Sequence, residues 1–172
     1  MDTHGPRKVY IFDASVFITL HRIDMDSIRL PQSVWDKLDS LLVAGTIISH
    51  RFVFEEVVRD SEKPDKISLW LKPRKGYFET TNEKPYLDMV KAVLLKFPKL
   101  IDIDNEKNQA DPWLVAMGVN KGLEHSDAEY IVVTQENKAK QTKIPAACRD
   151  FGVKSISLAD FFEEIGVKFN IS

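Results

Sequence analysis

The chain has 172 residues, 44% of them hydrophobic and 29% charged, so we expect one soluble globular domain over residues 1–172 with a substantial core. Its formal net charge of −2 excludes recruitment of nucleic acid by an overall positive field. The single cysteine, Cys148, excludes a disulfide framework and a thiolate zinc site. Because no apolar stretch has the length of a membrane span and the N-terminus lacks the features of a signal peptide, we expect a cytoplasmic protein with no membrane partner.

Strands and helices are predicted to alternate along the chain. The first strand covers residues 9–12, an unbroken apolar run that ends at Asp13. Apolar spacing and terminal Ser, Pro or Gly residues predict helices over 15–23, 31–45, 51–60, 66–72, 86–97, 110–122, 144–152 and 158–166. Further strands are expected at 46–49, 100–104, 130–134 and 153–157, whereas residues 72–85 have the composition of a loop. This alternation predicts an α/β fold with a central, mostly parallel sheet covered on both faces.

Acidic side chains follow several of these predicted strands. They are Asp13, Glu55, Glu56, Asp111 and Glu136. Ligands of an open parallel sheet bind outside the carboxyl ends of its strands, so the acids could lie along one edge of the sheet. Carboxylates gathered there repel one another and need protons or cations, and oxygen-only ligands suit Mg²⁺ or Mn²⁺. The pattern therefore predicts a site for Mg²⁺ or Mn²⁺ with Asp13 as one ligand.

Each acid also has a simpler interpretation. Asp13 could cap the helix that follows it, and Asp111 with Pro112 could form the cap and first turn of the helix at 110–122. Glu55 and Glu56 could both be surface acids, and helical geometry does not separate them. Only the whole set, placed at successive strand ends, favours a common site.

Four segments resemble those of PIN domains: "YIFDASVFI", "ISHRFVFEEVV", "ADPWLVAMG" and "VVTQENK". They place an Asp after the first strand, a Glu on an early helix, Ala-Asp at the start of a buried helix and Thr-x-acid after the next strand. The ending "KIPAACRDFGVKSISLADFFEEIG" is also similar, so the resemblance covers nearly the whole chain. It points to toxin-type bacterial and archaeal members. It implies a three-layer α/β/α sandwich and a metal-dependent ribonuclease, often the toxin of a toxin–antitoxin pair.

The resemblance assigns the catalytic, metal-binding positions to Asp13, Glu56, Asp111 and Glu136. Glu56 is preferred over Glu55 because the second acid of the family precedes an aliphatic residue. The fourth family position is usually Asp, so Glu136 is a departure. Ser15 and Thr134 match hydroxyl positions that can hydrogen-bond the metal-binding carboxylates, although each could also be a simple cap or turn hydroxyl.

The implied reaction is hydrolysis of RNA phosphodiester bonds by water activated at a Mg²⁺ or Mn²⁺ site. Basic residues have to offset the acidic pocket, and Lys138, Lys140 and Lys143 follow Glu136 directly. The resemblance also implies a homodimer and a possible antitoxin protein as partner. Two alternatives stay open: a catalytically weak module that binds RNA or protein, and a haloacid-dehalogenase-type phosphatase, which would need an acid at the position of Ser15.

Overall fold

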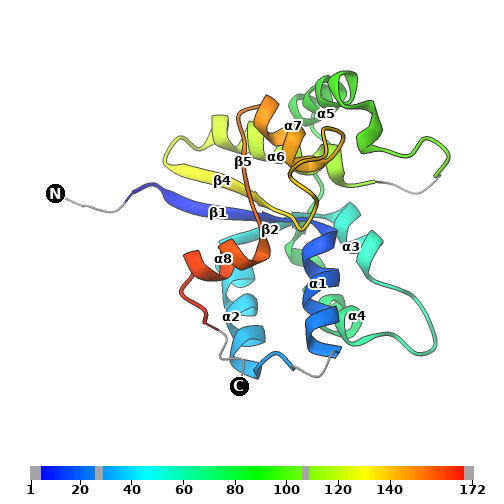
Figure 1. Ribbon diagram of the computed structural model, residues 1–172, viewed down its shortest axis with the longest axis vertical. Coiled ribbons are helices and arrows are strands. Elements are labelled where there is room, and N and C mark those ends of the chain that lie inside the picture. The colour runs from blue at the N-terminus through cyan, green and yellow to red at the C-terminus, as the bar shows by residue number, and fades with distance from the viewer. Residues whose placement is uncertain (1–4, 26–28, 106–108, 169–172) are drawn as a thin grey trace.

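The computed structural model describes residues 5–25, 29–105 and 109–168 (Figure 1). Within these residues, five strands form one sheet in the order β3-β2-β1-β4-β5, and every neighbouring pair is parallel. The strands are β1 (Arg7–Phe12), β2 (Ile47–His50), β3 (Phe78–Glu79), β4 (Ala128–Val133) and β5 (Lys154–Ile156).

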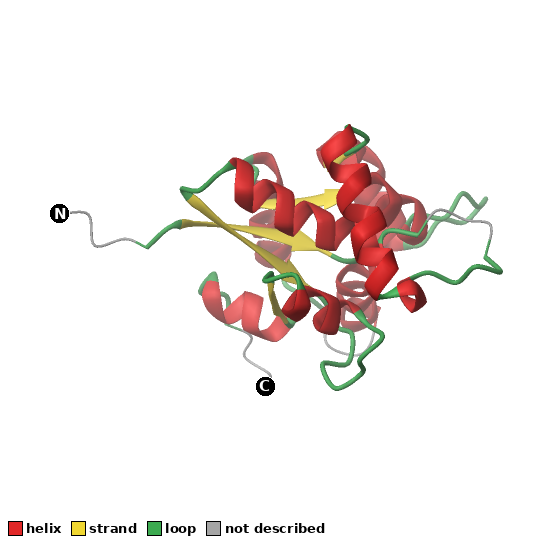
Figure 2. Ribbon diagram, turned by 90° about the horizontal axis from the view of Figure 1, so that it is seen from above, coloured by secondary structure: helices red, strands yellow, loops and turns green. Residues whose placement is uncertain are grey.

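Helices cover both faces of this sheet (Figures 1 and 2). One face carries α5 (Lys84–Lys96), α6 (Asp111–Glu124) and α7 (Ile144–Asp150). The opposite face carries α1 (Ala14–Met25), α2 (Gln32–Val43), α4 (Lys66–Leu71) and α8 (Leu158–Glu164), and α3 (Arg51–Val57) leads from the sheet to α4. Two short 3₁₀ helices, η1 (Lys72–Tyr77) and η2 (Pro98–Leu100), complete the described elements. The expected three-layer α/β/α architecture with a parallel sheet is confirmed.

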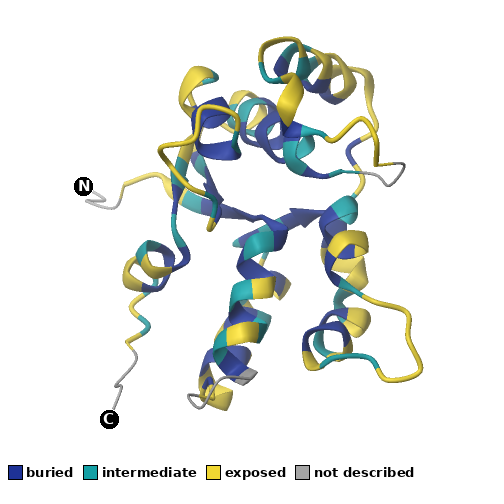
Figure 3. Cartoon of the chain, turned by 45° about the vertical axis from the view of Figure 1, so that its right-hand side comes forward, coloured by how far each residue is buried: buried dark blue, intermediate teal, exposed yellow. Residues whose placement is uncertain are grey.

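The core lies where β1 and β4 pass between the two helical layers. These strands pair along their whole length, from Arg7 opposite Ala128 to Phe12 opposite Val133. Their apolar residues are buried on both faces, as the continuous apolar runs predict (Figure 3). Phe161 of α8 closes one side, with its ring centroid 4.9 Å from that of Phe12. Because the two strands end in register, the residues that follow them emerge side by side.

Helix α6 is buried against the sheet, as its apolar composition predicts. Residues Leu114, Val115, Ala116 and Met117 have no exposed surface. Gly118 permits a close approach to the segment before β5, because a Cβ atom built there would lie 2.6 Å from Val153 Cγ1. This close contact packs the middle of α6 against Val153, the residue before β5.

The segment 72–85, expected as a loop, contains both η1 and β3. β3 pairs with β2 through Ser49 opposite Phe78 and His50 opposite Glu79. The buried side chain of Phe78 provides the apolar contact that a two-residue strand needs. The charged and Pro-Gly composition of the preceding residues conceals this strand in the sequence.

The strand expected at 100–104 is wrong. The side-chain Oε1 of Gln109 accepts a hydrogen bond from the Asp102 backbone N at 2.7 Å, and Gln109 Nε2 donates to the Asp102 carbonyl at 2.8 Å. The Asp102 carboxylate accepts from the Asp104 backbone N at 3.1 Å. These bonds occupy backbone groups that a strand would use, and Ile103 is 87% exposed. Although polar and apolar residues alternate in this segment, it does not pair with the sheet.

Across the described ranges, every helix is too short or too polar to cross a membrane.

Candidate functional site

Asp13 is the first residue after β1, and its carboxylate is held in a fixed orientation. It is 3% exposed. Its Oδ1 accepts from the Ala14 backbone N at 2.7 Å, and its Oδ2 accepts from the hydroxyls of Ser15 at 2.6 Å and Thr134 at 2.9 Å. Burial raises the pKa of Asp13, and the hydrogen bonds from Ser15, Thr134 and the backbone amides of Ala14 and Ser15 oppose that rise. Two strands thus converge on one buried carboxyl group.

Thr134 links Asp13 to the acid that follows β4. The Asp13 backbone N donates to the Val133 carbonyl at 3.1 Å, which continues the β1–β4 ladder to the strand ends. The Glu136 backbone N then donates to Thr134 Oγ1 at 3.2 Å. The Glu136 carboxylate accepts from the Ile144 backbone N at 2.9 Å, so this acid is tied to the start of α7. The point between β1 and β4 is also where the strand order changes direction, the usual ligand position in such sheets.

Glu56 and Asp111 approach from the next elements of the fold. Glu56 Oε1 accepts from the backbone N of Ala110 at 2.8 Å, which joins α3 to the start of α6. Ala110 occupies the cap position without a side-chain hydrogen bond, and Asp111 is the first residue of the helix rather than its cap. The interpretation of Asp111 as a cap is therefore wrong. Its carboxyl group lies in the first turn, where the helix dipole favours a negative charge.

The four carboxyl groups act on one another electrostatically. Burial is the main cause that raises the pKa of Asp111, to about 9, and the charges of Asp13, Glu136 and Glu56 raise it further. Burial likewise raises the pKa of Glu56, with added contributions from Asp13 and Glu136 and opposition from the Ala110 amide. The pKa of Glu136 is raised by burial and by Asp13. Asp13, Glu56, Asp111 and Glu136, which the sequence places far apart, therefore form one carboxylate cluster in space.

The donors of this cluster are oxygen atoms only, which fits a hard divalent cation such as Mg²⁺ or Mn²⁺. Among the residues that the structure describes, however, no group of three or more His, Cys, Asp or Glu side chains lies close enough to hold a metal ion directly. Three of the carboxylates accept protein hydrogen bonds instead. Binding of a cation would require the side chains to converge further, a movement that mutual repulsion opposes until positive charge is supplied.

His50 and Trp113 keep α3 and α6 in contact beside the cluster, a role that the sequence does not reveal. His50 Nδ1 accepts from the Phe52 backbone N at 3.0 Å and thereby caps α3. Its ring stacks on that of Trp113, with centroids 5.1 Å apart. Burial, followed by the charge of Arg51, lowers the pKa of His50 to about 4, so the ring is neutral at pH 7. His50 therefore caps the helix that carries Glu56 without adding charge.

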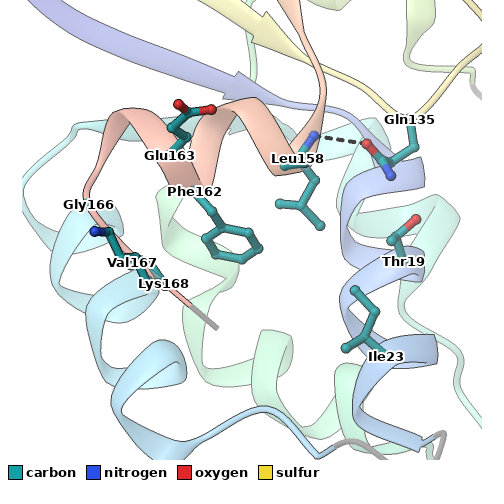
Figure 4. A pocket seen from close by; sticks show the side chains of 10 residues that line it. Thr19, Ile23, Gln135, Leu158, Phe162, Glu163, Gly166, Val167 and Lys168 are labelled. Atoms are coloured by element: carbon teal, nitrogen blue, oxygen red, sulfur yellow. Dashed lines mark hydrogen bonds between the residues drawn. The ribbon is translucent and has the colours of Figure 1, made fainter. Parts of the chain in front are cut away.

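Gln135 is a second residue that carries no recognisable pattern in the sequence. Its backbone N donates to Ser15 Oγ at 3.0 Å, and its side-chain Oε1 accepts from the Leu158 backbone N at 2.8 Å. Gln135 also lines a pocket of about 540 Å³ between α1 and α8 (Figure 4). Thr19, Leu158 and Phe162 are among its other lining residues, and none of the four carboxylates is. Gln135 thus connects the hydroxyl network around Asp13 to a mostly apolar neighbouring cavity.

The three lysines predicted to bind RNA occupy different positions. Lys143 lies next to Ile144, and its charge lowers the pKa values of Asp111 and Glu136. Lys138 instead places its Nζ 3.9 Å from Asp160 of α8, and Lys140 is exposed. The structure brings Lys143 to the carboxylate cluster and directs Lys138 away from it.

Cys148 lies in the core, close enough to the cluster that the charges of Asp13 and Glu136 act on its thiol. It has no exposed surface, and burial raises the pKa of its thiol to about 12. A neutral, enclosed thiol is a packing group rather than a nucleophile.

The comparisons with known proteins give one match. The model of a family described as "Domain of unknown function (DUF4411)" matches residues 10–169. The matched range contains all four carboxylates, Ser15 and Thr134. No curated protein and no solved structure matches the chain.

Proposed function

The chain belongs to the DUF4411 family, and we propose that it is a metal-dependent endoribonuclease of the PIN type. The observation that carries the proposal is the electrostatic cluster of Asp13, Glu56, Asp111 and Glu136 at the point where the strand order reverses. Such a concentration of oxygen ligands suits Mg²⁺ or Mn²⁺, the usual partners of phosphate chemistry. The resemblance of the same segments to PIN domains supports RNA as the substrate.

When bound, Mg²⁺ or Mn²⁺ lowers the pKa of a coordinated water and neutralises charge that develops on the phosphate. The protein has to hold ligands in place for this chemistry. Asp13 is held in one orientation by the Ser15 and Thr134 hydroxyls, whose hydrogen bonds favour its charged form. Asp111 carries a proton at neutral pH when no cation compensates its neighbours, and binding of a divalent ion has to displace that proton.

The toxin-type resemblance extends the proposal to a biological setting. We infer a toxin whose cleavage activity is held in check by an antitoxin protein, and a homodimer as its assembly. Both inferences depend on the resemblance and not on a surface of the molecule.

Cleavage of a mixed pool of RNA by the purified protein tests the proposal. We expect cleavage in the presence of Mn²⁺ and none after chelation of divalent ions by EDTA. A DNA pool of the same sequences, treated in the same way, shows whether the activity is specific to RNA. Intact RNA at saturating Mn²⁺ would contradict the proposal.

A second candidate is a module of the same fold that binds RNA or protein without cleaving. One observation favours it: within the described part of the chain, the carboxylates are not yet grouped at metal-binding distance. Calorimetric titration separates the two candidates, because a nuclease binds Mn²⁺ through the cluster and a bare scaffold does not.

Glu56 and Glu55 provide a matched pair of adjacent carboxylates. The Glu56 side chain bonds the Ala110 amide beside Asp111, whereas Glu55 lines a separate pocket with Lys72 and Lys75. We expect Glu56→Gln to lower kcat/KM for RNA by about 10-fold or more, since it removes a charge from the site while its amide oxygen can still accept from Ala110. Glu55→Gln should leave kcat/KM within about 2-fold of the original. Equal losses would show that the cluster does not distinguish the two acids.

Glu136 is the departure from the family pattern, and we expect it to be a peripheral ligand. Its carboxylate accepts a hydrogen bond from the Ile144 backbone N, and the side-chain oxygen of Gln can accept the same bond. Glu136→Gln should raise the Mn²⁺ concentration for half-maximal cleavage by about 10- to 100-fold, with most activity recovered at saturating Mn²⁺. A variant that excess Mn²⁺ does not rescue would place Glu136 among the principal ligands instead.

A further inference from the structure

Lys143 occupies a distinctive position at the edge of the carboxylate cluster. It is partly buried at the cap position of α7, and the next residue, Ile144, donates its backbone N to Glu136 at 2.9 Å. Its positive charge reaches both Glu136 and Asp111, the latter on a different helix. A single cation thus faces two carboxylates that belong to separate elements.

Within the described part of the chain, the ammonium group of Lys143 nevertheless makes no ion pair. Among the described residues, no carboxylate oxygen lies within 4.0 Å of its Nζ atom. The other lysines of the same segment differ from it, because Lys138 is 3.9 Å from Asp160 and Lys140 is exposed. Neither acts on Asp111 or Glu136. Lys143 therefore has a charge that acts on both Asp111 and Glu136 and that no described carboxylate pairs with.

An anionic substrate needs such a group. Four carboxylates repel the phosphodiester backbone of RNA, and the net charge of −2 offers no general attraction to offset that repulsion. A lysine that was already paired tightly with a carboxylate would contribute little to phosphate binding, because its charge would be neutralised. An ammonium held beyond ion-pair distance leaves room for a phosphate oxygen between it and the acids.

We propose that Lys143 binds a non-bridging phosphate oxygen of the RNA backbone at the carboxylate cluster, and so orients the strand toward Asp13 and Asp111. The inference rests on the proposed function and names the group that contacts its substrate. Lys143 is then a substrate-binding residue and not a metal ligand.

Loss of the Lys143 charge is expected to have opposite effects on the binding of RNA and of a divalent cation. Removal of the Lys143 charge weakens the hold on RNA, because a phosphate contact is lost. The same removal strengthens the binding of a divalent cation, because it takes a repelling positive charge away from Asp111 and Glu136. A residue with only a structural role would weaken both kinds of binding together when it is replaced.

The experiment compares Lys143→Gln with Lys37→Gln, which removes the same charge from an exposed position on α2. Mn²⁺ binding is measured by calorimetry, and cleavage of a short labelled RNA is measured over a series of salt concentrations. For Lys143→Gln we expect Mn²⁺ to bind about 2- to 10-fold more tightly, kcat/KM to fall about 10-fold, and the salt dependence of log(kcat/KM) to become shallower by about one unit. Lys143→Arg should recover most of the cleavage. Lys37→Gln should resemble the original protein in both measurements.

Two results would overturn the inference while leaving the proposed function intact. One is RNA cleavage that Lys143→Gln and Lys37→Gln reduce equally. The other is weaker Mn²⁺ binding by Lys143→Gln together with a lower melting temperature, which would indicate a structural role. If the original protein cleaves no RNA at saturating Mn²⁺, the proposed function fails and the inference fails with it.

Discussion

Replacement of Asp13 by asparagine is expected to abolish Mn²⁺-dependent RNA cleavage, by about 1,000-fold or more in kcat, while the protein stays folded. The carboxylate is buried at the end of β1 and lies within the electrostatic reach of the other three acids. Asparagine has the same shape but lacks the negative charge that a hard cation requires. Cleavage of a labelled RNA and the far-ultraviolet circular dichroism of the same preparation provide the two measurements.

The hydrogen bonds around Asp13 explain why the fold should survive. Asparagine can still accept from the Ala14 backbone N through its Oδ1 atom. Its Nδ2 group would donate to the Ser15 or Thr134 hydroxyl, and these hydroxyls lie 3.4 Å apart, so one can donate to the other. No buried polar group is left without a partner, which is the usual cause of a large loss in stability.

Asp24 offers a matched control, because it too is 3% exposed. Its carboxylate pairs with Lys66 at 2.6 Å and accepts from the Leu30 backbone N at 3.1 Å, away from the cluster. Asp24→Asn should lower the melting temperature by weakening the ion pair, yet the folded fraction should cleave RNA at the original rate. Full cleavage by folded Asp13→Asn, or its loss in Asp24→Asn at unchanged stability, would show that burial and not position determines the effect.

The part of the site that depends on strand ends could be predicted from the sequence. Two apolar runs, ended by Asp13 and by Thr134, indicate two buried strands of a parallel sheet. Once both are placed in the middle of that sheet, their carboxyl ends have to meet, and the hydroxyl of Thr134 does reach Asp13 at 2.9 Å. Local patterning was sufficient to locate these two strand ends, whereas the pairing of β1 with β4 is seen only in the structure.

The contacts between helices could not be predicted in the same way. Glu55 and Glu56 have similar surroundings in the sequence, and only the fold brings the start of α6 to one of them. The distinction among Lys138, Lys140 and Lys143 likewise depends on where α7 begins relative to Glu136. Tertiary packing determines which glutamate and which lysine lie at the cluster, and helical periodicity does not predict it.

The failed strand and the missed strand share a physical cause. The alternating residues at 100–104 have the right pattern, but side chains of Gln109 and Asp102 bind the backbone N and O of Asp102 and the backbone N of Asp104. β3 has only two residues, and it exists because β2 offers it an open edge and Phe78 fills the core. Short strands are determined by their neighbours more than by their own composition.

Replacement of Asp111 by asparagine is expected to stabilise the protein in the absence of divalent ions and to remove its stabilisation by Mn²⁺. Burial and three neighbouring carboxylates raise the pKa of Asp111 to about 9, compared with about 3.9 in an unfolded chain. The folded state therefore binds more protons than the unfolded state between these two values, and stability declines as the pH rises from about 4 to about 9. Asparagine does not ionise in either state, so the replacement removes this decline.

At pH 8 and in EDTA, we expect Asp111→Asn to raise the free energy of unfolding in urea by about 1–2 kcal/mol. The gain should disappear near pH 4, where Asp111 is protonated in the folded state and about half protonated in the unfolded state. Asp127→Asn removes an exposed acid before β4 and should change the free energy by less than about 0.5 kcal/mol at either pH.

Addition of Mn²⁺ at pH 8 should reverse the order of stability. Binding of Mn²⁺ stabilises the original protein by RT ln(1 + [Mn²⁺]/Kd), about 2.7 kcal/mol at 100 times the dissociation constant. Asp111→Asn lacks the carboxylate that binds the ion in place of a proton, so it should not gain this stability. The same carboxylate would then destabilise the metal-free protein and provide its affinity for the cation. If Asp111→Asn is no more stable than the original protein in EDTA at pH 8, or if Mn²⁺ stabilises both equally, the cluster is not built around Asp111 as a metal ligand.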